Sequence, residues 1–140
     1  MPNKNPIKTT DAGLYPEFII PKKFAGKKIT ISTKTSLSKE KWELDLIHAM
    51  RMTGGSIDFD PTPDIERAEL DTGKKLDGKK FALVSIATRI RNGGTPKAPK
   101  VNYAIKFESG EELVDDEFTM TSDETNPVTF YTKITFKLEK

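Results

Sequence analysis

The chain has no cysteine and only one histidine, His48. Without cysteine it forms no disulfide, no thiolate metal site and no cysteine nucleophile, as is usual for proteins of reducing compartments. One histidine is too few for a histidine-based zinc site. No apolar run approaches the ~18 residues of a membrane-spanning helix, and no hydrophobic signal segment follows Met1. We therefore expect no metal, no cofactor and no membrane contact, and the compartments favoured are the cell interior or a virion.

The chain also lacks a large excess of either charge. Its 23 basic and 21 acidic residues give a net charge of +2, which favours nucleic-acid binding only where the positive charge is segregated. A length of 140 residues fits one domain. Residues 1–16 contain three prolines and few apolar side chains. This composition predicts an extended amino-terminal arm over residues 1–16 and a single domain over residues 17–140.

Period-two alternation of apolar side chains dominates the rest of the chain. In residues 80–107, two apolar runs flank a basic loop rich in glycine and proline, which predicts a central hairpin whose first strand is buried on both faces. Residues 41–52 could begin as a helix capped by Ser38, but their apolar side chains occupy every even position, which favours a strand. Residues 36–40 then form a hairpin loop. The clearest alternation is in residues 128–138.

Shorter segments complete the predicted fold. Strands are expected at residues 18–20, 28–35, 56–59 and, more weakly, 112–120, with turns at residues 53–55, 76–78 and 109–110. Residues 63–70 could form two turns of helix. About eight strands without a long helix indicate an all-β protein, an antiparallel β-sandwich of the jelly-roll or immunoglobulin-like type, with a closed barrel as the next choice.

Few residues fit catalytic chemistry. His48 falls on the apolar face of its strand, without a serine or cysteine motif beside it, and is interpreted as structural. The acidic segment 58–64 lacks the spacing of a twelve-residue calcium loop, and its prolines stiffen it. The acids at 115–117 are adjacent and expected to face solvent, and Gly93-Gly94 lacks the residues of a phosphate-binding loop. The sequence therefore predicts a protein that is not an enzyme and binds no metal.

Basic residues around the predicted central loop suggest a second class of function. Single-stranded nucleic acid requires a basic groove and exposed aromatic side chains. Tyr103, Phe107 and Phe130 fall on apolar strand faces, where core packing is expected, whereas Tyr131 falls on a polar face. The candidate nucleic-acid contacts are Arg89, Arg91, Lys97, Lys100 and Tyr131.

The segment 79–118 is loosely similar to immunoglobulin-like bacterial domains and to small phage single-stranded-DNA-binding proteins. The similarity consists of the turns Arg91-Asn92-Gly93 and Glu108-Ser109-Gly110, and no residue role follows from it. The leading hypothesis is a non-enzymatic structural or interaction protein, a small subunit of a larger assembly such as a phage or virus particle. Its arm would contact a neighbouring protein or a second copy through Ile7, Leu14 and Tyr15. The alternatives are a single-stranded nucleic-acid-binding protein that uses residues 89–100 and a cell-surface immunoglobulin-like recognition module.

Overall fold

The computed structural model describes residues 7–8, 17–37, 42–53, 55–59, 64–91, 100–114, 117–122 and 127–140. These residues form two β-sheets with nine strands of four or more residues and two strands of two residues. Sheet A contains β1 (Ile7–Lys8), β2 (Glu17–Ile20), β4 (Trp42–Met52), β5 (Gly55–Phe59), β7 (Lys80–Arg91) and β11 (Val128–Leu138). Sheet B contains β3 (Lys28–Leu37), β6 (Ala68–Thr72), β8 (Val101–Ser109), β9 (Glu112–Leu113) and β10 (Phe118–Ser122). The all-β prediction is confirmed.

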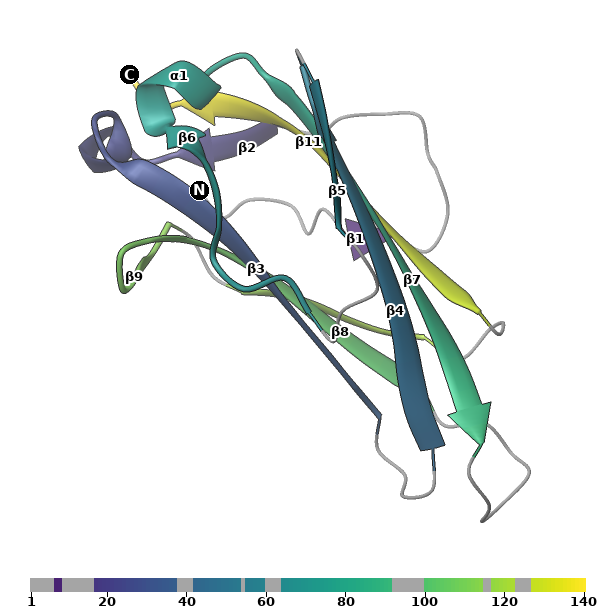
Figure 1. Cartoon of the computed structure of the whole chain (residues 1–140). Helices are drawn as coiled ribbons and strands as arrows, with labels where there is room; N and C mark the ends of the chain where they lie inside the picture. Colours follow the sequence, from purple (N-terminus) through teal and green to yellow (C-terminus); the bar gives the residue numbers. More distant parts are fainter. Residues whose placement is uncertain are drawn as a thin grey trace.

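The two sheets form separate layers, with β4, β7 and β11 in one and β3 and β8 in the other (Figure 1). The strand order is β1-β11-β7-β4-β5 in sheet A and β10-β8-β3-β6 in sheet B. β9 pairs with β8, and β2 pairs with the end of β11 in parallel. Sheet A is therefore mixed, and the prediction of a purely antiparallel fold is wrong for it. Alternation along each strand carries no information about the direction of a partner that is distant in sequence.

The predicted central hairpin over residues 80–107 is also wrong. β7 lies in sheet A between β4 and β11, whereas β8 lies in sheet B between β3 and β10. The chain therefore crosses from one sheet to the other after β7. The hairpin expected around residues 36–40 is wrong for the same reason, because β3 and β4 lie in different sheets. The strands on either side of the turn expected at residues 53–55, β4 and β5, pair antiparallel.

Two further local predictions fail. Residues 68–72 form β6, paired with residues 28–31 of β3, and no helix occurs within the described residues 64–70. Tertiary pairing overrides the local preference there. The backbone N–H of Thr33 in β3 donates to the carbonyl of Ile65, and the N–H of Ile65 donates to the hydroxyl oxygen of Thr33. The segment 112–120 contains two strands, β9 and the start of β10, instead of one.

The remaining expected strands are present, including the disputed segment 42–52, which is β4. The turns at 76–78 and 109–110 are confirmed by the left-handed backbone of Gly78 (φ 84°) and Gly110 (φ 64°). The only helices in the described parts are the 3₁₀ turn η1 (Lys22–Phe24) and α1 (Gly73–Leu76). Neither is long and apolar enough to cross a membrane.

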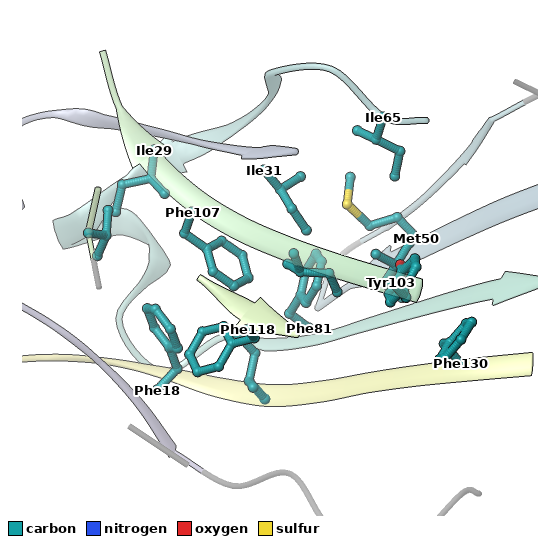
Figure 2. Close-up of a cluster of buried hydrophobic side chains, with 14 of the residues drawn as sticks. Phe18, Ile29, Ile31, Met50, Ile65, Phe81, Tyr103, Phe107, Phe118 and Phe130 are labelled. Atoms are coloured by element: carbon teal, nitrogen blue, oxygen red, sulfur yellow. The ribbon is translucent and has the colours of Figure 1, made fainter. Parts of the chain in front are cut away.

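One hydrophobic core lies between the inner faces of the two sheets. Phe18 from sheet A contacts Phe107 and Phe118 from sheet B, and Phe107 also meets Phe81 (Figure 2). Further along, the ring of Tyr103 from sheet B stacks on Phe130 from sheet A, with centroids 4.5 Å apart. The expected core positions of Tyr103, Phe107 and Phe130 are confirmed. The core of the described residues thus occupies the inner faces of the two sheets.

Candidate functional site

A chain of three polar side chains runs through the core from one sheet to the other. His48 Nδ1 on β4 lies 2.8 Å from Ser85 Oγ on β7, and that oxygen lies 2.5 Å from the hydroxyl of Tyr103 on β8. Alternation directs all three side chains inward, since His48 and Ser85 are opposite one another in the register of β4 and β7. The arrangement joins the two sheets through hydrogen bonds inside the core.

Burial determines what this chain can do. His48 is 0% exposed, and Ser85 and Tyr103 are also buried, so a substrate has no direct access to the serine hydroxyl. Desolvation lowers the pKa of His48, and the negative charge of Asp64 partly opposes that shift. Burial also raises the pKa of the Tyr103 hydroxyl. These shifts keep both side chains neutral, which suits a structural link between the sheets.

Asp64 is the acidic residue of segment 58–64 whose contacts are described. Its carboxylate accepts hydrogen bonds from the hydroxyls of Thr33 and Thr35 and from the backbone N–H of Thr35, at 2.9–3.0 Å. Asp64 thereby fastens the segment before β6 to β3. Among the described residues, no group of three or more His, Cys, Asp or Glu side chains could hold a metal ion. The side chain of Asp58, and Asp60 altogether, lie outside what the structure describes.

A polar groove of about 490 Å³ lies on the outer face of sheet B. β3 and β8 form its floor, where Ala104 stands opposite Lys34 and leaves space. The charged side chains that line it are four acids and three bases: Asp64, Glu66, Glu108, Glu117, Lys34, Arg67 and Lys106. Glu108 is only 6% exposed, and its Oε1 lies 3.6 Å from Lys106 Nζ. Acidic and basic side chains thus alternate around the groove, with one acid in excess.

The structure separates the candidate nucleic-acid residues. Arg89 points into the core and is 5% exposed, because it continues the inward alternation of β7. Arg91 and Lys100 are exposed at the ends of β7 and β8, which lie in different sheets, and Lys97 lies outside the described residues. Tyr131 is half-buried on the outer face of sheet A, opposite Val84. Val84 and Arg91 are roughly 23 Å apart along β7, at about 3.3 Å per residue.

The proposed assembly residues of the arm are only partly described. Ile7 belongs to β1, which pairs with β11 of its own chain, Ile7 opposite Thr132 and Lys8 opposite Tyr131. Leu14 and Tyr15 lie outside the described residues. Strand pairing therefore holds one short piece of the arm against the edge of sheet A beside β11.

The outer face of sheet A carries an apolar strip that sequence reasoning missed. Ile47 on β4 is 45% exposed and Ile90 on β7 is 44% exposed. The strip consists of six side chains from three adjacent strands: Ile47, Ala49, Val84, Ile86, Ile90 and Tyr131. Residues in register on neighbouring strands share a face, so five of these side chains are contiguous, whereas Ile90 stands opposite Glu43, beyond the pair of Asp45 and Thr88.

The apolar outer residues of β7 were the available signal for this strip. Apolar side chains occupy both faces of β7, and the sequence therefore predicted that both faces are buried. Instead the inner face is buried and the outer face is only half-buried, with Ile90 exposed. A central strand with two apolar faces in a two-layer protein leaves one of them outside the core between the layers.

Comparison with known proteins gives no relative: no family model matches the chain, and no curated protein or solved structure matches it either.

Proposed function

We propose that the protein is a non-enzymatic interaction protein, a small subunit of a larger assembly such as a phage or virus particle. The observation that carries this proposal is the apolar strip on the outer face of sheet A. Contiguous exposed apolar surface on a soluble domain is a mark of protein–protein contact. The polar chain of His48, Ser85 and Tyr103 is enclosed in the core, where it links the sheets.

We further infer an immunoglobulin-like arrangement of the strands. In that fold, strand B pairs with E in one sheet, and strand C pairs with F in the other. The pairings of β3 with β6 and of β4 with β7 follow this scheme in the same chain order, and β5 beside β4 takes the place of strand C′. The chain departs from it after β7, because β8 and β10 join sheet B before β11 returns beside β7. Domains with this pairing commonly serve recognition and assembly.

The amino-terminal arm is the second segment that we assign to assembly. Backbone hydrogen bonds at the edge of a sheet are the physical means by which an extended segment adds to a neighbour. We expect a chain without residues 1–14 to stay folded and to associate less than the full chain. A truncated chain that associates as well as the full one would remove the arm from the proposal.

Three exposed apolar residues provide a matched test of the apolar strip. Ile47 and Ile90 lie on the outer face of sheet A, whereas Leu113, with the same 44% exposure as Ile90, lies on β9 of sheet B. We expect Ile47→Ser with Ile90→Ser to weaken self-association in sedimentation velocity, and Leu113→Ser to leave it unchanged.

Equal association of all variants would contradict a role for the strip. A full chain that stays monomeric at low and moderate salt and binds a labelled oligonucleotide would contradict the whole proposal and support nucleic-acid binding.

A further inference from the structure

The polar groove on the outer face of sheet B is large enough for a small molecule. Its volume of about 490 Å³ is within the ~300–1,000 Å³ of small-molecule pockets. Asp64, one of its four acids, is already held by hydrogen bonds from Thr33 and Thr35. Three acids and three bases therefore remain around the groove: Glu66, Glu108, Glu117, Lys34, Arg67 and Lys106.

Glu108 on β8 is a buried acid whose hydrogen bonding is incomplete. Its Oε1 has no hydrogen-bond partner among the described residues. The Nζ of Lys106 lies 3.6 Å from this oxygen, which is beyond hydrogen-bond distance. A buried carboxylate oxygen without a donor is costly, and such groups in folded proteins commonly mark a place for a further molecule. An N–H donor that enters the groove beside Lys106 would complete the hydrogen bonds of Glu108.

Arg67 provides the opposite charge from a strained backbone. Its φ of 47° lies in the left-handed region, which is rare for a residue other than glycine. The backbone N–H of Arg67 donates to Ser32 Oγ at 3.0 Å, which holds the residue beside the floor of the groove. No described residue forms an ion pair with its guanidinium. Strain of this kind is typical of positions where the placement of the side chain has a role.

The register of β3 and β8 gives the distance between these two charges. Ser32 stands opposite Lys106, and Glu108 is the next outward residue of β8. Arg67 lies on the other side of Ser32. Two strand spacings of about 4.8 Å and two residues of about 3.3 Å thus separate the Cα atoms of Arg67 and Glu108, roughly 12 Å in all. A guanidinium and a carboxylate therefore stand on opposite sides of the groove floor, with space for a small molecule between them.

We propose that the groove binds a small zwitterion with one ammonium and one carboxylate group, as a free amino acid or a short peptide has. The ammonium donates to Glu108, and the carboxylate accepts two parallel hydrogen bonds from the guanidinium of Arg67. A ligand without net charge fits a groove that holds three acids and three bases, whereas a simple anion or cation is repelled by half of them. The groove lies on sheet B, so this inference is independent of the apolar strip on sheet A.

NMR titration of the isotopically labelled full chain tests the ligand and locates its site. The probes are glycine, glycylglycine and triglycine, whose charged ends lie increasingly far apart, so the best binder distinguishes an amino acid from a peptide. We expect shifts at Ser32, Arg67 and Ala104, in the groove. Acetylation of the amino group of the best binder, or amidation of its carboxylate, should weaken binding about tenfold or more, because each removes one charged contact.

Two substitutions separate the two contacts. Glu108→Gln should lower the affinity for the zwitterion to that of its acetylated form and leave the acetylated form unaffected. Arg67→Gly removes the guanidinium and suits the left-handed backbone, so it should lower the affinity to that of the amidated form without loss of stability in urea unfolding. Glu69→Gln, at an exposed acid of β6 outside the groove, is the matched control and should leave binding unchanged.

Three results would overturn the proposal. The first is the absence of shifts in the groove for all three zwitterions up to about 10 mM. The second is equal binding of a zwitterion and its acetylated and amidated forms, since the two charges would then have no role. The third is a loss of affinity in Glu69→Gln as large as in Glu108→Gln, which would indicate a general effect of surface charge.

Discussion

The hydrogen-bonded chain of His48, Ser85 and Tyr103 makes a quantitative prediction about stability. Substituting Ser85→Ala removes the central hydroxyl and leaves both His48 Nδ1 and the Tyr103 hydroxyl buried without that partner. An unsatisfied buried polar group costs about 1–3 kcal/mol, so we expect the free energy of unfolding to fall by about 3 kcal/mol. The prediction holds for either tautomer of the imidazole, because both lose the same contact.

Tyr103→Phe is the matched milder change. It removes the phenolic hydroxyl but keeps the ring that stacks on Phe130, and Ser85 keeps its contact with His48. The loss of one hydrogen bond without an orphaned partner costs about 1 kcal/mol. In the double variant, position 103 has no hydroxyl that could be left without a partner, so only His48 Nδ1 loses its hydrogen bond to Ser85. The double variant should therefore lose only about 2 kcal/mol, less than the sum of the two single losses.

Urea unfolding followed by circular dichroism and by the fluorescence of Trp42 measures these differences, since the chain has one tryptophan. The refuting result is additivity. If the double variant loses the sum of the single losses to within about 0.5 kcal/mol, the two hydroxyls are energetically independent and the chain does not link the sheets.

Two further predictions concern stability. Burial lowers the pKa of His48, opposed in part by Asp64, whereas the unfolded chain binds the proton near pH 6.5. The free energy of unfolding should therefore fall below about pH 6.5 by up to about 1.4 kcal/mol per pH unit, and His48→Gln should flatten this slope; an unchanged slope would contradict the assignment. A Cβ on Gly73 would lie 2.5 Å from the carbonyl oxygen of Phe24, whereas one on Gly26 would meet nothing within 4 Å. Gly73→Ala should cost about 1–3 kcal/mol in urea unfolding and Gly26→Ala less than about 0.5 kcal/mol, and equal losses would refute the close packing.

Strands were predictable from the sequence where one face is buried. In residues 42–52 and 128–138, alternation marks every inward side chain, and the structure agrees at each of these elements. The pairing of strands was not predictable in the same way. β7 and β8 both alternate and are joined by a turn-forming segment, yet they lie in different sheets, because pairing depends on contacts between distant residues.

The candidate sites show the same limit. Arg89 was assigned to an accessible basic loop, although the inward alternation of Phe81, Leu83, Ser85 and Ala87 continues to it and directs it into the core. Ile47 lies on the side of its strand that also carries charged residues, so the local pattern alone predicts no apolar surface there. It becomes part of a strip only when the register of β4 and β7 brings it beside Ile86, which no local pattern specifies.

The central proposal is that the outer face of sheet A makes protein–protein contacts, which self-association of the chain would report. The most direct measurement is the molar mass of the purified full chain by light scattering across a concentration series, at low and moderate salt. The account predicts a reversible rise above 15.7 kDa as the concentration increases. A constant 15.7 kDa at all concentrations and both salts would contradict it.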